Sequence, residues 1–218
     1  MVFLLVILII IWPRLRSWLN QPISLVKVHA PFLYLKREKV EVMLESHLKS
    51  HFFQLSLTEI RRFLLSQPWV KEVSLKKEWP DKLVVLLEEQ EPVARWHELY
   101  LITGEGYVFK PVDLGGFDHM PLLKGPEDQA QEVMQQYLAI SQLLRPLGLV
   151  VQEIELGRTG AWSFNVSGVH VVIGEDWRME RLQRFVRLYH ARLEPKWKYV
   201  KRIDLRYPNG AAVAWNNE

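Results

Sequence analysis

Two histidines and a group of glutamates are the residues of this 218-residue sequence whose types and spacing could do chemistry. His47 and His51 stand four positions apart, so one helix face could present both imidazoles to a metal ion. No third ligand is signalled nearby, and solvated surface histidines are the simpler interpretation. Glu88, Glu89 and Glu91 could provide a general acid and a general base, but nothing in the sequence would separate their pKa values. We favour a solvated strand end for these glutamates.

The motifs of the common catalytic sites are missing from the sequence. It contains no glycine-rich phosphate loop, no G-x-S-x-G nucleophile elbow and no H-E-x-x-H zinc motif. The cysteine count is 0, which excludes disulfides, thiol nucleophiles and cysteine-ligated zinc. The formal net charge is only +3, with both signs interspersed, and so gives no reason to expect nucleic acid. We therefore expect a protein that is not an enzyme and that has no cofactor, metal or nucleic-acid partner.

Five arginines line much of one predicted helix between residues 176 and 195. Lipid headgroups or an acidic partner could bind such a row. Apolar residues alternate with the arginines, however, which is typical of an ordinary helix with one solvated and one buried face. We favour the solvated face. The arginines are Arg178, Arg181, Arg184, Arg187 and Arg192.

An unbroken apolar run, VFLLVILIIIW, occupies residues 2–12 and ends at Pro13, with Arg14 and Arg16 close behind. Because a helix needs about 20 apolar residues to cross a bilayer, this run is short for a complete span. It also lacks the preceding basic stretch and the small-x-small cleavage site of a signal peptide. We expect one membrane anchor in residues 1–19, truncated at its start, with a cytoplasmic tail upstream.

Residues 23–90 show the pattern of a small α+β domain with two helices on a three-stranded sheet. A strand over 23–30 precedes two amphipathic helices, and the second helix opens on a capping box formed by Ser56 and Glu59. Two strands follow, joined at Trp79-Pro80-Asp81. Residues 83–87 are apolar at odd and at even positions, so both faces of this strand are apolar. We therefore expect the last strand to be central and at least partly covered on both faces. The helices are expected in 37–48 and 56–67, and the two strands in 69–77 and 82–89.

Residues 91–218 favour a larger β-rich domain with two helices, so the whole chain belongs to the α+β class. A meander of short strands comes first, and each of the two helices is followed by further strands. A terminal hairpin completes the domain. The strands are expected in 93–96, 98–103, 107–111, 149–156, 161–166 and 169–174, the helices in 128–145 and 176–195, and the hairpin in 202–215.

The terminal hairpin, RIDLRYPNGAAVAW, suits a three-residue loop in which Gly210 supplies the positive φ of a bulge. That register places all the apolar side chains on one face. Leu205 and Val213 would then pack into a core, whereas Tyr207 and Trp215 are the amphipathic type that anchors interfaces. The AAVAW strand has no charged residue or proline that would prevent pairing with another strand, so we expect a free edge kept for a partner. The pairs are Tyr207 with Ala211, Leu205 with Val213, and Ile203 with Trp215.

Three segments together resemble the FtsQ/DivIB family of bacterial cell-division proteins, and the LLKGPED segment favours the Gram-negative branch of that family. They are PWVKEVSLKKEWPDKL with EPVARW, LLKGPEDQAQEVMQQY, and YVKRIDLRYPNGAAVAW. The resemblance spans nearly the whole chain from residue 23. It implies a POTRA domain in 23–90 and, in 91–218, a β domain that ends in a partner-binding hairpin.

The resemblance also implies a function without chemistry. Members of the family are single-pass inner-membrane proteins, mostly periplasmic and enriched at the division septum. They bind the FtsB–FtsL pair and help to control septal peptidoglycan synthesis, with FtsK, FtsW and FtsI as further partners. POTRA domains also serve export and membrane-protein assembly, which is the alternative function. Such factors usually carry tandem POTRA units and a long β-barrel, for which this sequence has no room.

The resemblance places two partner sites on this sequence. A weaker one, for recruitment, falls on Leu75 and Lys77, although Glu72 stands where relatives usually have a neutral polar residue. Leu75 could instead pack into the small core. The stronger site, for FtsB, comprises Arg206, Tyr207, Gly210, Ala211, Ala212, Val213, Ala214 and Trp215.

Overall fold

The structure is a computed structural model that describes residues 21–48, 51–176 and 179–216. The predicted membrane anchor, residues 1–19, lies outside these residues. Within the described part, no helix is both long and apolar enough to cross a membrane. The chain divides between Gln90 and Glu91 into two compact units, which we call unit 1 and unit 2.

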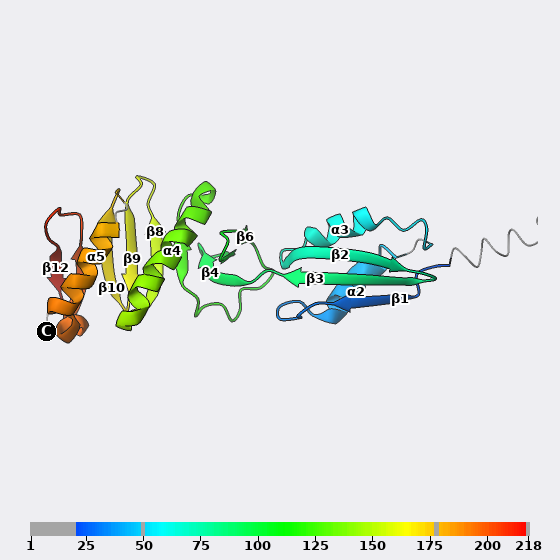
Figure 1. The fold of residues 1–218 in the computed structure, drawn as a ribbon, viewed down its shortest axis with the longest axis horizontal. Helices are drawn as coiled ribbons and strands as arrows, with labels where there is room; N and C mark the ends of the chain where they lie inside the picture. The colour runs from blue at the N-terminus through cyan, green and yellow to red at the C-terminus, as the bar shows by residue number, and fades with distance from the viewer. Residues whose placement is uncertain (1–20, 49–50, 177–178, 217–218) are drawn as a thin grey trace, which may run out of the picture. The chain divides into compact units, whose positions relative to one another are not determined.

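Unit 1 consists of a small mixed sheet with helices packed on one face (Figure 1). Its elements are β1 (Leu25–His29), α2 (Arg37–Glu45), α3 (Leu57–Leu65), β2 (Val70–Glu78) and β3 (Lys82–Glu89). The described residues of unit 1 form a three-stranded sheet in the order β1-β3-β2. β1 runs parallel to β3, and β2 runs antiparallel to it. β3 is therefore central, as the sequence predicts.

Local sequence explains where α3 begins and which face it buries. The Ser56 hydroxyl accepts the N–H of Glu59 at 3.3 Å, which satisfies one of the unpaired N–H groups at the start of the helix. One turn apart, Ile60 and Leu64 are both buried and join the same core as Val85 of β3. The amphipathic pattern of this segment is thus confirmed.

The second face of the unit 1 sheet is largely open. Val28, Val85 and Leu87 pack with the helices in one core cluster on the first face. On the opposite face, Val84 is half-buried, whereas Leu86 is 50% exposed. The expected partial cover of the second face therefore reaches Val84 but not Leu86, because both helices pack on the other side of the sheet.

Unit 2 is built on a mixed sheet. In chain order, its helices and strands are β4 (Pro92–Trp96), β5 (Tyr100–Thr103), β6 (Val108–Phe109), β7 (Leu122–Lys124), α4 (Ala130–Leu144), β8 (Val151–Leu156), β9 (Trp162–Val166), β10 (Val169–Gly174), α5 (Met179–Leu188), β11 (Val200–Asp204) and β12 (Ala212–Trp215). Short 3-10 turns span Glu127–Gln129 and Arg145–Leu147 beside α4, and a π turn (Tyr189–Leu193) and a 3-10 turn (Glu194–Tyr199) follow α5. As far as the structure describes this unit, nine strands pair in the order β12-β11-β10-β9-β8-β7-β4-β5-β6.

Strand β7 is absent from the sequence-based prediction, yet it joins the two halves of the sheet. It pairs in parallel with β4, where Arg95 lies opposite Leu122, and with β8, where Leu123 lies opposite Ile154. Without β7, the meander β4-β5-β6 would have no ladder to the remaining strands. A three-residue strand is too short for its periodicity to be recognised.

Helices α4 and α5 cover one face of the unit 2 sheet (Figure 1), and the principal core lies between these two layers. Ile140 of α4 and Phe185 of α5 are both fully buried in one cluster with Phe164 of β9. The rings of Phe164 and Phe185 meet edge-on, with centroids 6.2 Å apart, which is a preferred aromatic geometry. The alternating apolar residues of β9 thus face the helices, as do Val200 and Ile203 of β11.

The opposite face of the unit 2 sheet carries a row of hydrogen-bonded polar side chains across neighbouring strands. Lys124 donates to one oxygen of Glu153 at 2.6 Å, and the Asn165 amide donates to the other at 3.0 Å. The His170 ring lies 2.8 Å from the Asn165 carbonyl oxygen. These side chains satisfy one another's hydrogen-bonding groups, so within the described residues this face remains polar without a covering helix.

Candidate partner-binding site

Strand β12 forms one edge of the unit 2 sheet (red in Figure 1). Among the described residues it pairs with β11 alone. The N–H of Asn216, just after β12, donates to Tyr199 at 2.7 Å, and the N–H of Leu205, just after β11, donates to Val172 of β10 at 2.8 Å. Hydrogen bonding alternates along a strand. Ala212 and Ala214 therefore direct their backbone groups toward β11.

By the same alternation, Val213 and Trp215 direct their backbone N–H and C=O groups away from β11. This is the exposed ladder edge to which an additional strand can pair. The expectation of a free edge at AAVAW is therefore confirmed for the described part of the chain, where no strand lies on the outer side of β12.

The two faces of β12 differ. Val213 and Ala211 are half-buried and pack against the core of unit 2. Ala212 and Ala214 are exposed on the opposite face. At one end of the strand, Trp215 is 45% exposed.

The register of the terminal hairpin differs from the predicted one by two residues. Val213 lies opposite Ile203 rather than Leu205, and Ala212 lies opposite Asp204. The segment that connects the two strands is accordingly longer and runs over residues 205–211. A shift of two positions leaves every side chain on its predicted face, whereas a shift of one would reverse them all. The predicted core face is therefore confirmed, but the three-residue loop is wrong.

The side chain of Asp204 helps to set the start of this longer loop. Its carboxylate accepts the backbone N–H of Arg206 at 3.1 Å and the Nη2 of the same residue at 2.6 Å. Hydrogen bonds from the Arg206 guanidinium hold the pKa of the Asp204 carboxyl below its usual range. This pairing lies where β11 ends, and a side chain that bonds nearby backbone in this way competes with the backbone hydrogen bonds of a tight turn.

The guanidinium group of Arg184, on α5, holds the far side of the loop. One Nη donates to the carbonyl of Leu205 at 3.1 Å, and the other donates to the carbonyl of Pro208. Arg181, one turn earlier on the same helix, donates to the carbonyl of Ile173 at 2.6 Å. The interpretation of the arginine row as a plain solvated face is therefore wrong for Arg181 and Arg184, which tie α5 to neighbouring backbone.

Of the predicted partner residues in the loop, Arg206 and Tyr207 are accessible. Arg206 keeps 59% of its side chain exposed while it is paired with Asp204. Its aliphatic part lies over Gly174, where an added Cβ would come within 3.0 Å of the Arg206 Cγ. Tyr207 is 56% exposed, so the structure leaves its ring available to a partner.

Gly210 does not play the conformational part that the sequence predicts. Its φ lies outside the left-handed region, and a Cβ built at this position would meet no atom within 4 Å. A tight bulge turn would require glycine, but the longer loop does not. The fold itself therefore gives no reason for glycine at this position.

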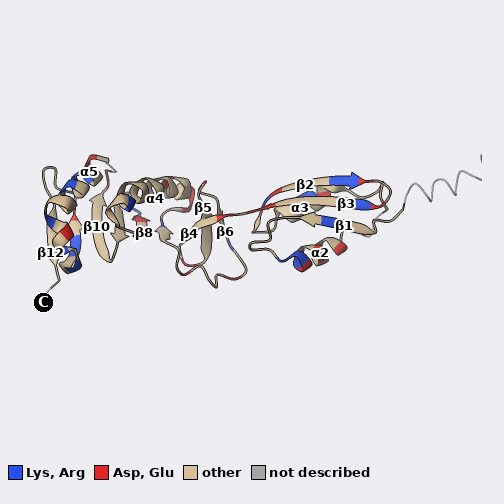
Figure 2. Ribbon diagram, turned by 60° about the horizontal axis from the view of Figure 1, so that its bottom comes forward, with Lys and Arg blue, Asp and Glu red and all other residues tan. Residues whose placement is uncertain are grey.

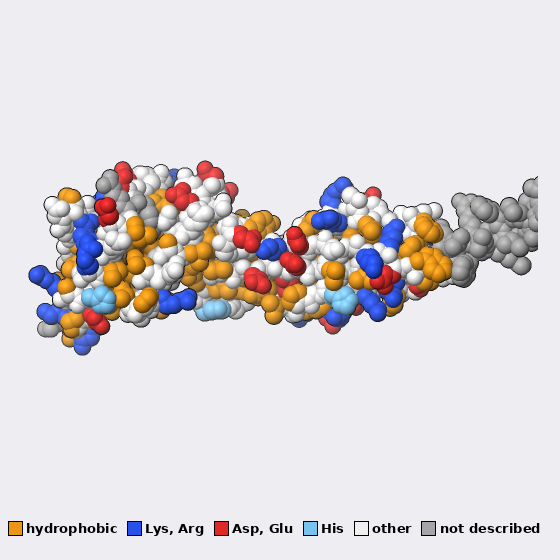
Figure 3. Space-filling model, in the orientation of Figure 1, with side chains coloured by type: hydrophobic (Ala, Val, Ile, Leu, Met, Phe, Trp, Pro, Cys, Tyr) orange, Lys and Arg blue, Asp and Glu red, His pale blue; other side chains and the backbone are white. Residues whose placement is uncertain are grey.

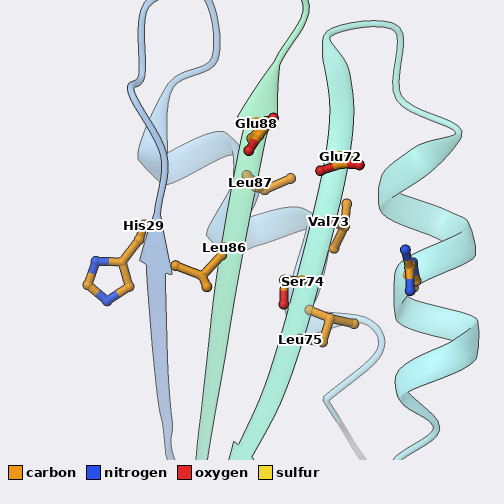
Figure 4. A pocket seen from close by; sticks show the side chains of 9 residues that line it. His29, Glu72, Val73, Ser74, Leu75, Leu86, Leu87 and Glu88 are labelled. Carbon is orange, nitrogen blue, oxygen red and sulfur yellow. The ribbon is translucent and has the colours of Figure 1, made fainter.

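The second predicted surface, on β2 of unit 1, borders a groove of about 530 Å³ (Figure 4). Glu72 lines the groove close to Glu88 of β3 (Figure 4). Leu75 also lines it but is half-buried against the core of unit 1. The Lys77 ammonium donates to the carbonyl of Phe52 at 2.7 Å. A recruitment role for Leu75 and Lys77 stays a prediction.

The candidate acid–base glutamates do not form a solvated cluster. Glu89 is buried, and its Oε2 accepts the backbone N–H groups of Tyr34 at 2.7 Å and Leu35 at 3.4 Å. Glu88 and Glu91 are on the surface: Glu88 is exposed beside the groove, and Glu91 is exposed in the connection to unit 2. Glu89 thus fixes the loop before α2, a structural role that sequence periodicity does not reveal.

The histidine pair does not share a helix. Helix α2 ends at Glu45, before either histidine. The His47 ring lies 2.9 Å from the Ser46 hydroxyl and packs on Phe63, whereas His51 is exposed in the next loop. In the described residues, no group of three or more His, Asp or Glu side chains could hold a metal ion.

In this chain, unit 1 is followed by a larger β-rich unit with a free sheet edge. This order of units is that of a POTRA-containing protein with a second, mixed α+β domain. Two families match the chain: "POTRA domain, FtsQ-type" over residues 21–90, and "Cell division protein FtsQ/DivIB, C-terminal" over residues 94–206. The chain belongs to the FtsQ/DivIB family of cell division proteins.

Curated relatives support the same family. The cell division protein FtsQ of Cellvibrio japonicus is 35% identical over 202 residues, which is 92% of this chain and 63% of that protein. Those of Coxiella burnetii and Shewanella oneidensis are each 32% identical and cover 90% and 93% of this chain. The chain spans 81% and 79% of these two proteins. The match to the C-terminal family ends at Arg206, before β12.

Proposed function

We propose that this chain is a non-enzymatic scaffold of the division machinery that binds the FtsB–FtsL pair in the periplasm by adding a partner strand to β12. The supporting observation is the edge position of β12, with the backbone groups of Val213 and Trp215 directed outward. An incoming FtsB strand would continue the sheet of unit 2 through main-chain hydrogen bonds. Such pairing supplies affinity, while side chains fix the register.

Side chains around this edge suit the proposed role. Trp215 and Tyr207 are both about half exposed, and large amphipathic rings of this kind often dominate binding energy. Ala212 and Ala214 are small, so side chains of an added strand could lie close to the sheet on that face. The exposed guanidinium of Arg206 would act at the rim, where a charge mainly affects association rate and specificity.

The proposal extends to location and to further partners. Residues 2–12 would anchor the chain in the inner membrane as a single pass, with units 1 and 2 in the periplasm and enriched at the septum. FtsK, FtsW and FtsI would be further partners, with recruitment contacts at Leu75 and Lys77 of unit 1. Together these interactions would help to control septal peptidoglycan synthesis.

Co-purification tests the FtsB interaction. We expect Trp215→Ala, in the fragment from residue 21 onward, to lose FtsB–FtsL while its circular-dichroism spectrum stays that of the wild type. Trp79→Ala is the matched control, because Trp79 is 48% exposed against 45% for Trp215 but lies in unit 1. Retention of the pair by Trp215→Ala and also by Tyr207→Ala would contradict the proposed site.

A further inference from the structure

Two loops at one end of unit 1 expose aromatic side chains. Trp79, in the turn between β2 and β3, is 48% exposed, and Phe53, in the loop before α3, is 62% exposed. Leu25, at the start of β1, is 44% exposed. We call these three residues the aromatic tip. Hydrophobic side chains gather at this end of unit 1 in Figure 3.

Hydrogen bonds fasten both loops to the first described residues of the chain. The Asp81 carbonyl, in the β2–β3 turn, accepts the N–H groups of Ser24 at 3.0 Å and Leu25 at 3.3 Å. In the other loop, the Phe52 N–H donates to the carbonyl of Gln21 at 2.8 Å. The aromatic tip is therefore held beside the point where residues 1–20 join unit 1.

The two loops are also fastened to each other. The Lys77 ammonium at the end of β2 donates to the Phe52 carbonyl at 2.7 Å and lies 5.6 Å from the centre of its ring. The buried Phe52 ring in turn meets Phe53 edge-on, at 5.3 Å between centroids. This support presents Phe53 outward on a fixed backbone.

Lysines flank the aromatic tip. Lys76 keeps 73% of its side chain exposed, and Lys82 keeps 30%. Both ammonium groups lie near the Glu78 carboxylate, at 3.2 Å and 3.4 Å. Basic residues colour the last part of β2 in Figure 2. Exposed tryptophan beside lysine is the combination found at membrane–water interfaces, where the ring enters the headgroup layer and the ammonium stays with the headgroups.

The sequence limits how far Gln21, the first described residue of unit 1, can lie from the apolar run. Residues 13–20 are the eight that separate the run from Gln21. At about 3.5 Å per residue when fully extended, they span roughly 28 Å. Gln21, whose carbonyl accepts the N–H of Phe52 beside Phe53, must therefore lie within about the thickness of one bilayer core from the end of the run.

We propose that the aromatic tip, Leu25, Phe53 and Trp79, inserts into the headgroup layer of the bilayer that holds residues 2–12, with anionic headgroups at Lys76 and Lys82; this rests on the membrane attachment proposed above. The tip is then a second attachment point beside the anchor. Because the anchor already holds unit 1 at the bilayer, this second contact forms at a high effective concentration, and it limits the orientations of unit 1 at the membrane.

Site-specific labelling tests the insertion directly, since the chain contains no cysteine. Phe53→Cys and Trp79→Cys are each labelled with an environment-sensitive fluorophore in the full chain, reconstituted into phosphatidylethanolamine–phosphatidylglycerol vesicles. Leu65→Cys is the matched control, because Leu65 is 42% exposed but lies at the end of α3, near the start of β2 and away from the β2–β3 turn. We expect nitroxide-labelled lipid to quench positions 53 and 79 at least twofold more than position 65.

Equal quenching at all three positions would overturn the insertion. Vesicle flotation of the same samples separates the two proposals. If the chain floats with its vesicles but positions 53 and 79 are not preferentially quenched, the membrane attachment is supported and the insertion of the aromatic tip is contradicted. A chain that does not float contradicts the membrane attachment and the insertion together. Replacing phosphatidylglycerol by phosphatidylcholine should reduce the quenching at position 79 if Lys76 and Lys82 bind anionic headgroups.

Discussion

A proline at position 213 tests the direction of the free edge of β12, because proline removes one backbone N–H. The N–H of Val213 points away from β11, so its loss breaks no hydrogen bond within the sheet. Proline is tolerated on edge strands where the missing N–H faces solvent. We therefore expect Val213→Pro to change the free energy of unfolding by less than about 1 kcal/mol.

Proline at the next position is the matched control. Ala214 lies opposite Arg202, and its N–H points toward β11. Ala214→Pro removes that hydrogen bond and leaves a carbonyl of β11 unpaired, which costs about 1–3 kcal/mol. At roughly 4 °C per kcal/mol for a domain of this size, the melting temperature should fall by about 4–12 °C.

Val213→Pro should keep its fold but bind FtsB more weakly than the wild type. An added FtsB strand would use the Val213 N–H, so Val213→Pro loses one intermolecular hydrogen bond and introduces a ring at the contact. A loss of about 1–3 kcal/mol corresponds to a roughly 5- to 150-fold weaker Kd. Val213→Ala keeps the N–H and should bind within a few-fold of the wild type.

Isothermal titration calorimetry with the periplasmic part of FtsB–FtsL, together with thermal unfolding by circular dichroism, measures both quantities. The reasoning would be refuted if Val213→Pro bound like the wild type. It would also be refuted if Val213→Pro melted as low as Ala214→Pro, because the Val213 N–H would then point toward β11.

Two further predictions concern the loop of the hairpin, and one concerns unit 1. Because the folded-state pKa of Asp204 is lowered, its carboxylate stabilises the fold above its unfolded-state pKa of about 3.9, and this stabilisation is lost as pH falls through the folded-state pKa. Asp204→Asn should therefore lower the melting temperature at pH 7 and flatten its decline below about pH 4; an unchanged acid profile would contradict the pairing. Gly210→Ala should melt within about 2 °C of the wild type, since its Cβ meets no atom, and a larger drop would mean that the loop does require glycine. Glu89→Ala should destabilise unit 1 by about 2–4 kcal/mol in urea unfolding because two backbone N–H groups lose their acceptor; wild-type stability would exclude that role.

The sequence predicts most elements of unit 1 because short-range signals define them. Ser56 marks the start of α3, and apolar residues at both parities of β3 mark a central strand. The faces of the terminal hairpin also follow from period-two alternation alone. Such features depend on neighbours within a few residues, so they can be recognised without tertiary information.

The features that the sequence does not predict depend on distant contacts. The hairpin register is set in part by Arg184, which reaches the loop from α5, about 20 residues earlier in the chain. The buried Glu89 carboxylate accepts the N–H groups of Tyr34 and Leu35, which lie 55 and 54 residues earlier in the sequence. Strand β7 exists because β4 and β8 flank it. No local pattern contains these partners.

The most direct test of strand addition at β12 is amide hydrogen exchange, resolved by residue with NMR, in the fragment from residue 21 with and without FtsB–FtsL. We expect the outward N–H groups of Val213 and Trp215 to gain protection on binding. Those of Ala212 and Ala214, which already bond within the sheet, should be protected in both states. Unchanged exchange at Val213 and Trp215 in a complex that has demonstrably formed would contradict strand addition at this edge.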